Sequence, residues 1–401
     1  MKKLATFLAV FSVFAFCAIN TAACDAYGNG DAYGNGDAVY ELTEDGNAYM
    51  VSGFTGNPVD LTIPAVYKEK PVMGVKENAF LNCLSLSKLT VSDECLYFEL
   101  GKGAFKDCYG LAEVSLPSAL VQIPDEAFAH CTALKSISLP NVVTVGKSAF
   151  EQCQLESVFL PKVATIGEKA FQYCSTLKTV NLPIGTQSGI PYPMYTVGAY
   201  AFSYCFNALE SIDLQNARAI GEYAFEHCSA LKTLNFGTNL ASVGEKAFDK
   251  CPVIETITGS VGTVSKVKNG CLLINSKLIL AGSNGTVPDG TSIIGDYAFC
   301  DHTALTEIVI PDTVTEIGEY AFAHCENVST VVIGSGVTRI KNCAFAAPNK
   351  TGLADFGGIT YHGTIAQWNN IQKDSGWDAG SFWGNLTVHC DGGDTQINKN
   401  A

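Results

Sequence analysis

Cysteines that recur at one position of a repeated string are the residues of this chain best suited to chemistry. The string "GEYAFEHCSALKTLNF" (Gly221 to Phe236) returns as "GEKAFQYCSTLKTVNL" (Gly167 to Leu182) and "GEYAFAHCENVSTVVI" (Gly318 to Ile333). Nine of the sixteen cysteines follow the phenylalanine of an Ala-Phe pair by three residues: Cys83, Cys108, Cys131, Cys153, Cys174, Cys205, Cys228, Cys251 and Cys325. Thiols at a fixed spacing can form disulfides, bind a metal ion or pack as small apolar side chains.

The spacing favours packing, with disulfides and a metal site as the alternatives. Stacked coils lie about 4.8 Å apart, within reach of a bridge, but equivalent residues of a stack point the same way, which suits disulfide geometry poorly. Histidine precedes the cysteine at His130, His227 and His324, but not in consecutive units, and zinc needs four converging ligands. The unit at Phe299 carries His302 in place of the cysteine while the pattern otherwise continues, which supports packing.

The sequence holds no recognisable catalytic motif. We find no His-Glu-x-x-His string, no phosphate loop and no G-x-S-x-G elbow between a predicted strand and helix. The recurrent acids stand at turn positions and are typical of a solvated repeat surface: Asp107, Glu126, Glu168, Glu222, Glu245 and Glu319. We therefore expect no enzymatic activity, no metal ion and no cofactor.

A repeat positions these residues. Ala-Phe pairs end at Phe80, Phe105, Phe128, Phe150, Phe171, Phe202, Phe225, Phe248, Phe299, Phe322 and Phe345. Most steps are 21 to 25 residues, but one is 31 and one is 51. A period near 23 residues predicts a solenoid in the leucine-rich-repeat range.

One unit, "AFAHCTALKSISLPNVVTVG" (Ala127 to Gly146), shows the order of elements. Leu134, Ile137 and Leu139 follow an L-x-x-I-x-L spacing whose end alternates apolar and polar, as in a half-buried strand. Pro140 ends the strand. The Ala-Phe segment is too short for a long helix and predicts one helical or 3₁₀ turn on the convex side. The expected fold is an α/β repeat solenoid, a superhelix with a parallel concave sheet and short convex helical turns.

The N-terminus is typical of an export signal. Lys2 and Lys3 precede an apolar run of about sixteen residues from Leu4 to Ile19, which is short for a membrane span. Cleavage before Cys24 would leave a lipidated first residue, as in bacterial lipoproteins; ordinary signal cleavage is the alternative. The tandem DAYGNG that follows predicts a flexible tether. We expect an extracellular or cell-surface protein.

The predicted organisation has five segments. Residues 1–23 are a signal peptide, 24–38 a tether, 39–75 an N-terminal cap, 76–352 the solenoid and 353–401 a C-terminal cap. The long step in the solenoid predicts a variant hairpin-like unit at about 252–292. The last segment holds all three tryptophans, Trp368, Trp377 and Trp383, and we interpret them as covering the last coil, with an aromatic ligand site as the alternative.

The combination "IGxxAFxxCxxLxxIxLP" resembles the BspA-like leucine-rich repeat proteins of bacteria and some protists. The resemblance covers about residues 59 to 350, and the segments "NGCLLINSKLILAGSNGTVPDGTSIIGDYAF" and "ITYHGTIAQWNNI" are also similar to parts of that family. It implies a solenoid displayed at the cell surface, in a family associated with adhesion to host proteins, extracellular matrix and other cells.

Two surfaces are candidates for partner binding. The outward positions of the strands carry small polar residues with almost no bases, and the long 184–196 loop adds proline and aromatic residues. The candidate contacts are Ser136, Ser138, Ser157, Phe159, Thr179, Asn181, Ser211, Asp213, Thr233, Asn235, Tyr192 and Tyr195. The formal charge of −14 argues against nucleic acid as a partner. We expect an extracellular protein or glycoprotein; a spacer with no dedicated ligand is the alternative.

Overall fold

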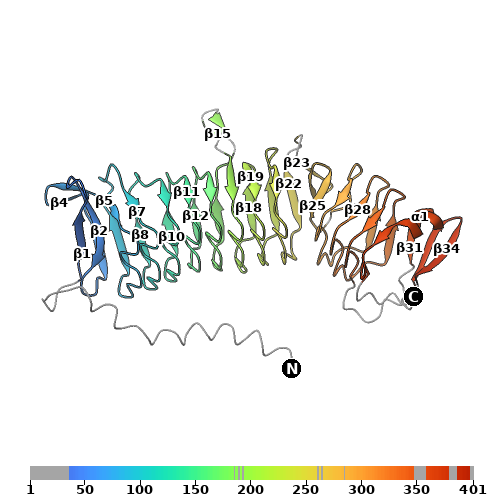
Figure 1. The fold of residues 1–401 in the computed structure, drawn as a ribbon, viewed down its shortest axis with the longest axis horizontal. Helices are drawn as coiled ribbons and strands as arrows, with labels where there is room; N and C mark the ends of the chain where they lie inside the picture. The colour runs from blue at the N-terminus through green and yellow to red at the C-terminus, as the bar shows by residue number, and fades with distance from the viewer. Residues whose placement is uncertain are drawn as a thin grey trace, which may run out of the picture.

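The computed structural model describes residues 36–184, 186–187, 190–191, 194–259, 262, 265–283, 285–346, 358–378 and 386–397. The predicted signal peptide, Cys24, Tyr192 and Trp383 lie outside these residues. Figure 1 shows an elongated array in which successive coils lie side by side from the N-terminal strands to the C-terminal ones. The chain therefore forms one repeat body, as the sequence period predicts.

Each regular coil contributes a longer strand and a shorter one. The longer strands hold the L-x-x-I-x-L segment: β3 (Asp60–Ile63), β6 (Lys88–Val91), β8 (Glu113–Ser115), β10 (Ser136–Ser138), β12 (Ser157–Phe159), β14 (Thr179–Asn181), β18 (Ser211–Leu214), β20 (Thr233–Phe236), β22 (Thr256–Gly259), β27 (Glu307–Ile310), β29 (Thr330–Ile333), β31 (Ile359–Thr364) and β33 (Leu386–Asp391). They pair in parallel, in the runs β3-β6-β8, β10-β12-β14, β18-β20-β22 and β27-β29-β31-β33. A one-coil shift therefore brings equivalent residues into register.

Most of the shorter strands end directly before a glycine. The shorter strands are β7 (Glu99–Leu100), β9 (Gln122–Ile123), β11 (Thr144–Val145), β13 (Thr165–Ile166), β17 (Tyr195–Val197), β19 (Ala217–Ile220), β21 (Ser242–Val243), β26 (Ile293–Ile294), β28 (Glu316–Ile317), β30 (Arg339–Ile340) and β32 (Gln372–Lys373). Most pair in parallel with the next, but pairing stops at β21 and resumes at β26. The second sheet is thus interrupted at the long step of the repeat.

The Ala-Phe segment is not helical, which corrects the prediction of convex helical turns. In the coil at Phe80 the N–H groups of Ala79, Leu81 and Cys83 donate to carbonyls three residues earlier, so the segment is a run of overlapping β-turns. Asn78 and Asn82 have φ of +56° and +61°, and the equivalent residues of the other coils are also positive. A positive φ ends a right-handed helix. The fold is a parallel β-solenoid whose one helix among the described residues is α1 (Ile365–Asn370).

These positive-φ residues make a prediction about stability. Ser148 has φ of +52°, and its N–H donates to the Glu168 carbonyl of the next coil at 2.8 Å. Valine at this position should lower the free energy of unfolding by about 1–2 kcal/mol, because a branched side chain is strained at this φ. Glycine should leave it within about 1 kcal/mol of wild type. Urea denaturation of both variants checks this, and equal stabilities would contradict it.

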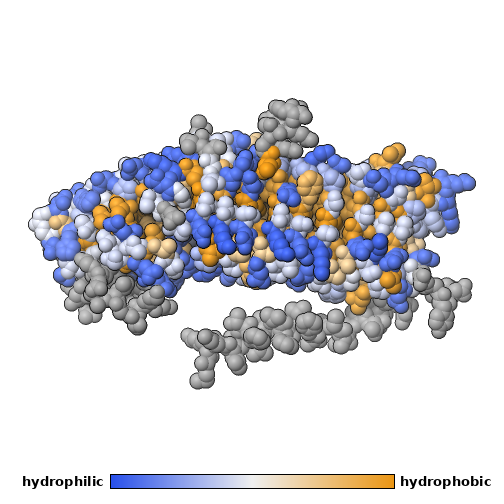
Figure 2. Space-filling model, turned by 180° about the vertical axis from the view of Figure 1, so that it is seen from behind, coloured by the Kyte–Doolittle hydropathy of each residue, from blue (hydrophilic) through white to orange (hydrophobic). Residues whose placement is uncertain are grey.

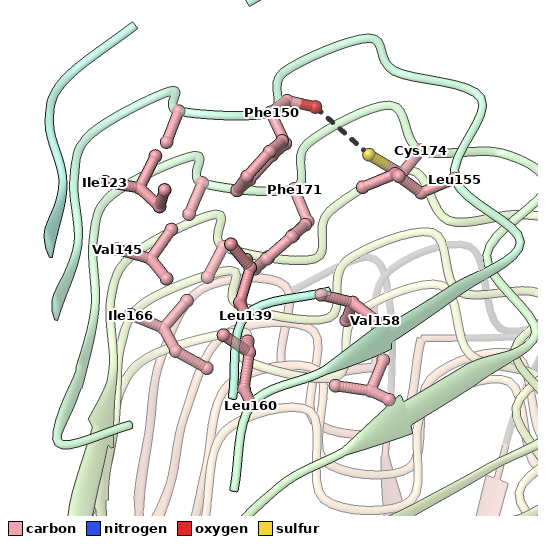
Figure 3. Packing of buried hydrophobic residues seen from close by; sticks show 14 of the residues in the cluster. Ile123, Leu139, Val145, Phe150, Leu155, Val158, Leu160, Ile166, Phe171 and Cys174 are labelled. Atoms are coloured by element: carbon pink, nitrogen blue, oxygen red, sulfur yellow. Dashed lines mark hydrogen bonds between the residues drawn. The ribbon is translucent and has the colours of Figure 1, made fainter. Parts of the chain in front are cut away.

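Phenylalanines form the centre of the core. One ladder runs from Phe54 through the Ala-Phe pairs to Phe248, with successive ring centroids 5.0 to 5.6 Å apart. A second runs from Phe299 to Phe345, and Trp377 covers its end edge-on at 6.0 Å. Figure 3 shows Phe150 and Phe171 among the aliphatic residues of neighbouring coils. The buried residues accordingly fall into two clusters, before and after the long step.

The Phe+3 cysteines pack in the core and also make a hydrogen bond. The thiol of Cys174 donates to the carbonyl oxygen of Phe150 in the preceding coil at 3.2 Å (Figure 3). The same bond recurs at 3.0 to 3.5 Å for Cys108, Cys131, Cys153, Cys205, Cys228, Cys251 and Cys325. None of the cysteines in the described part of the chain forms a disulfide. A thiol suits this position because it is apolar enough for a core and can donate to one carbonyl.

His302 replaces the cysteine for a structural reason. Ala281 occupies the phenylalanine position of the preceding unit, since its N–H donates to the Ala298 carbonyl as the phenylalanine N–H does elsewhere. The Nε2 atom of His302 lies 2.7 Å from the Ala281 carbonyl oxygen, the bond that the thiol makes in other coils. Its ring packs edge-on against Phe299 at 5.8 Å. The imidazole thus makes the contact with the preceding unit that the thiol makes elsewhere.

Irregular elements lie at the ends and at the long steps. The N-terminal end is β1 (Ala38–Leu42), β2 (Tyr49–Phe54), β4 (Val66–Tyr67) and β5 (Lys70–Val75). The hairpins are β15 (Thr186–Gln187) with β16 (Ile190–Pro191), and β23 (Ser265–Lys268), β24 (Cys271–Ile274) and β25 (Lys277–Ala281). At the C-terminal end α1 buries Trp368 beside Trp377, and β34 (Gly393–Ile397) pairs with β33. Within the described segments no helix has the length and apolarity to cross a membrane.

Candidate functional site

The outward side chains of the longer strands form one surface, here called the strand face. On β10, β12 and β14 the residues Ser136, Ser157 and Thr179 are paired in register, as are Ser138, Phe159 and Asn181. All six side chains are exposed, while the residues between them point into the core. The structure therefore brings six of the predicted contacts together on one patch.

Phe159 is the one aromatic residue of this patch. It is 47% exposed and lies between Ser138 and Asn181 of the neighbouring strands. Val309, at the matching position of β27, is 48% exposed. An exposed aromatic ring among small polar residues is the arrangement in which one side chain can dominate the affinity for a partner.

Further along the strand face the polar residues bond to one another. The Asp213 carboxylate accepts from the Asn235 amide at 3.1 Å and from Gln215, and the Thr258 hydroxyl donates to Asn235 at 3.2 Å. Ser211 is exposed, and Thr233 and Asn235 are half-buried. Asp213 and Asn235 are therefore already engaged, so the β10-β12-β14 patch offers more unsatisfied polar groups to a partner.

Charged residues of alternating sign line one edge of the strand face. Lys178 pairs with Glu156 at 3.2 Å, and Lys232 pairs with Glu210 at 3.5 Å. Exposed pairs of this kind contribute little to stability. On the reverse side of the array, Figure 2 shows bands of apolar residues between hydrophilic ones and a row of hydrophilic side chains that crosses several coils. The edge pairs leave the strand face close to neutral, without a strong field of either sign.

The predicted contact at Tyr195 is wrong. Its side chain is 0% exposed, and its hydroxyl donates to the Asp213 carbonyl at 3.2 Å. Tyr195 opens β17 and points into the core beneath the loop, and burial raises the pKa of its hydroxyl. Tyr192 lies outside the described residues, and Ile184 and Met194 are the large apolar residues of the loop that are exposed on the surface described here.

The histidine–cysteine pairs do not converge on a site. The His227 ring stacks on Tyr204 at 4.5 Å, whereas the adjacent Cys228 points inwards to the Phe202 carbonyl. His130 lies 2.6 Å from Asp107; burial opposes ionisation of Asp107, but this hydrogen bond and the charge of His130 lower its pKa overall. No group of three metal-ligating side chains occurs among the residues that the structure describes. The repeated string is thus explained by packing between coils.

Comparison with known proteins agrees with this architecture. Six copies of the BspA type leucine-rich repeat region match residues 98–189, 195–280 and 282–358, which is more than half of the chain. The chain belongs to the BspA-type leucine-rich repeat family. The family match spans the hairpin unit of β23, β24 and β25 as well as the regular coils. The resemblance predicted from the repeat is therefore confirmed.

Two solved structures show the same BspA-type fold. A leucine-rich repeat protein from Bacteroides ovatus is 24% identical, with a TM-score of 0.57, and the match covers 84% of this chain and 97% of that one. A leucine-rich cell surface protein from Faecalibacterium prausnitzii A2-165 is also 24% identical, with a TM-score of 0.53, covering 87% and 99%. No curated protein matches this chain. At this identity the likeness shows the fold alone.

One feature of this BspA-type chain was missed by sequence reasoning. The structure has a cavity of about 280 Å³ between the coil that ends at Cys251 and the coil that begins at Gly295. The available signal was the 51-residue step between Phe248 and Phe299, which we interpreted only as a variant unit. The cavity depends on how the hairpin packs, which the repeat pattern does not specify.

Proposed function

We propose that this protein is exported, is displayed at the cell surface and binds an extracellular protein or glycoprotein through the strand face. The observation that carries the proposal is the patch on β10, β12 and β14, where five exposed hydroxyl or amide side chains surround the exposed ring of Phe159. Aromatic rings supply much of the affinity of interfaces, and small polar side chains supply hydrogen bonds around them. A solenoid repeats such a patch over a broad area.

Surface display is supported by the N-terminal sequence, which combines a signal-like apolar run with Cys24 and a Gly-rich segment. The cell surface protein from Faecalibacterium prausnitzii has the same fold. Intact-mass measurement and fractionation of the expressed protein test this part of the proposal. A retained N-terminal methionine and a chain confined to the cytoplasm would overturn it.

The second candidate is a structural spacer with no dedicated ligand. The edge of alternating charges and the small polar residues would then only keep the array soluble. Fold alone does not separate the two functions. A spacer should tolerate charge reversal over the strand face, whereas a binding protein should not.

Binding by the strand face is expected to depend on Phe159. The full chain is screened against matrix glycoproteins, plasma proteins, mucins and glycans by surface plasmon resonance. Phe159→Ala should weaken the binding of a captured partner by about tenfold or more, because it removes the aromatic side chain of the patch. The matched control is Val309→Ala, which removes an equally exposed apolar side chain at the same strand position and should bind as wild type.

A broader variant tests the whole surface. In one variant, lysine replaces Ser136, Ser157, Thr179 and Thr233, which adds four positive charges to the strand face. If this variant no longer binds a partner while its circular dichroism is unchanged, the partner binds to the strand face. Binding that is indifferent to both Phe159→Ala and the lysine variant would rule out the strand face, and the absence of any partner in the panel would favour the spacer.

A further inference from the structure

A notch interrupts the turn side of the array at the hairpin unit, where Ala281 stands at the phenylalanine position. One wall is the turn segment from Gly244 to Cys251, and the other is Gly295 to His302 together with the end of β25. Its volume of about 280 Å³ lies near the lower end of the range for ligand sites, enough for one large side chain with its backbone. The walls belong to described residues, and none of the residues already discussed for the strand face lines it.

The first wall has backbone donors without acceptors. In the preceding coil the N–H groups of Tyr223, Phe225 and His227 donate to the carbonyls of Glu245, Ala247 and Asp249 at 3.1, 2.7 and 2.8 Å. The equivalent donors at the notch are Lys246, Phe248 and Lys250. The Lys250 N–H instead donates a hydrogen bond to the Asp249 carboxylate at 3.0 Å. The other two N–H groups have no hydrogen-bond partner in the described part of the chain.

Other coils show that this loss is particular to the notch. The donors of the coils at Phe202, Phe299 and Phe322 reach the carbonyls of the following coil. Backbone N–H groups at a buried edge require acceptors. The carbonyls that satisfy them elsewhere come from alternate residues of one chain segment, the spacing that an extended peptide presents. The first wall is thus an unfilled edge that fits a peptide backbone.

The core beside this edge lacks one aromatic ring. Phe248 stacks on Phe225 at 5.2 Å, and the next ladder begins at Phe299. Phe248 and Cys251 are each 8% exposed, whereas Phe225 and Cys228 are 0% exposed. The Phe248 ring therefore lines the notch and is slightly more exposed than the rings of the regular coils, and the hairpin unit beside it has Ala281 at the phenylalanine position.

The charges around the notch favour a basic ligand. Lys250 pairs with Asp301 at 3.4 Å, Asp296 pairs with Lys341 at 3.4 Å, and the Lys246 ammonium lies over the Tyr297 ring at 4.7 Å. The lining as a whole holds four carboxylates, Glu245, Asp249, Asp296 and Asp301, against the three ammonium groups of Lys246, Lys250 and Lys277. This excess of negative charge disfavours an acidic peptide.

We propose that the notch binds an extended peptide segment of a partner protein, laid between the turn segment from Gly244 to Cys251 and the end of β25. The segment carries a small residue followed by an aromatic one, with a lysine or arginine beside them. Its carbonyls accept from Lys246 and Phe248, its ring stacks on Phe248, and its basic side chain meets Glu245 or Asp249. The small residue is required because the alanine of each coil is almost fully buried, as Ala247 is here. This site is independent of the strand face.

A turn segment of this chain provides the sequence of a test peptide. Residues 101–108, GKGAFKDC, form a turn segment with two lysines and one aspartate. The probe is this octapeptide with serine at its last position, blocked ends and a fluorophore, and it is titrated with the full chain by anisotropy. We expect saturable binding, at least tenfold weaker binding after replacing the peptide phenylalanine with alanine, and weaker binding of the acidic counterpart from residues 221–228, GEYAFEHC.

Variants of the full chain locate the site. Cys300→Phe places a ring in the notch from its second wall and should weaken peptide binding at least tenfold. Cys343→Phe makes the same exchange at another half-exposed cysteine outside the notch and should bind as wild type. Phe159→Ala should also bind as wild type, which separates this site from the proposed function of the strand face.

Hydrogen exchange provides a measurement that does not depend on any variant. The amides of Lys246 and Phe248 should exchange more slowly when the peptide is bound. The proposal is overturned if the octapeptide does not bind the wild-type chain. Equal binding of its alanine version, unchanged binding by a folded Cys300→Phe chain, or unaltered exchange at the two amides would also overturn it.

Discussion

Replacement of Phe150 with alanine is expected to lower the free energy of unfolding by about 3–5 kcal/mol. The ring is fully buried and lies between Phe128 at 5.5 Å and Phe171 at 5.3 Å, nearly parallel to both. Its removal opens a cavity that touches two coil interfaces, and the backbone of the stack restricts how far the coils can close over it. Urea denaturation followed by circular dichroism measures the loss.

The matched control is Phe159→Ala, which removes the same side chain from an exposed position on β12. Surface changes of this kind usually alter stability by no more than about 0.5 kcal/mol. A repeat array is held by contacts between neighbours only, so the loss at Phe150 should also appear as a broader transition or an intermediate. A loss at Phe150 no greater than that at Phe159 would refute the ladder as the main source of stability.

Alkaline pH is expected to unfold the array under reducing conditions. Burial raises the pKa of the Cys131, Cys153, Cys228 and Cys251 thiols well above its usual value, and that of Cys271 to about 12. In the unfolded chain a thiol ionises at about pH 8.5. Because the folded-state pKa is the higher one, these thiols contribute their full stability below about pH 8.5 and lose it as the pH rises towards the folded-state pKa.

The effect is large because many thiols share it. Each buried thiol lowers the free energy of unfolding by about 1.4 kcal/mol per pH unit once the unfolded-state thiol is ionised. The eight cysteines that donate to a carbonyl of the preceding coil together reach about 11 kcal/mol per pH unit on this basis, comparable to the whole stability of a typical domain. Circular dichroism and urea midpoints between pH 8 and 10.5, with a reducing agent present, measure the slope.

Tyrosines and lysines also titrate in this range. The contribution of the thiols is therefore measured by comparing the wild-type chain with a variant that lacks two of them. The variant Cys153→Ala, Cys174→Ala keeps every other titratable group and removes two ladder thiols. Its stability should fall less steeply above pH 9, by about 3 kcal/mol per pH unit. Identical slopes for the variant and the wild-type chain would show that the buried thiols do not govern the alkaline transition.

Most of the coil could be predicted from the sequence. The positions of Leu134, Ile137 and Leu139 predicted a strand with alternating burial, and β10 has Ile137 buried between two exposed serines. The Ala-Phe period predicted the phenylalanine ladder because identical units stack only in register. The turn conformation was missed because residues such as Ser148 and Tyr223 adopt positive φ against their intrinsic preference, fixed by a hydrogen bond to the next coil.

The exposed positions of the candidate surfaces were predicted correctly on the strands but not at the loop. Ser136, Ser157 and Phe159 lie exposed on one patch because side-chain direction in a strand follows from position alone. Tyr195 was assigned to a loop surface, but it belongs to β17 and its hydroxyl reaches a carbonyl of another coil. An insertion removes the periodic frame that identifies inward positions, so the burial of its flanking residues was not predictable from the spacing.

The sequence by itself determined the period and the strand positions, favoured packing of the cysteines over disulfides and a metal site, and indicated the BspA-type family. These follow from local order, because each unit carries its own apolar pattern and every unit repeats it. Only the tertiary structure decided which carbonyl each thiol meets, why His302 replaces a cysteine, and that a notch opens beside Phe248. Those features belong to the interface between two coils, and an interface is set by the distance and packing of both partners together.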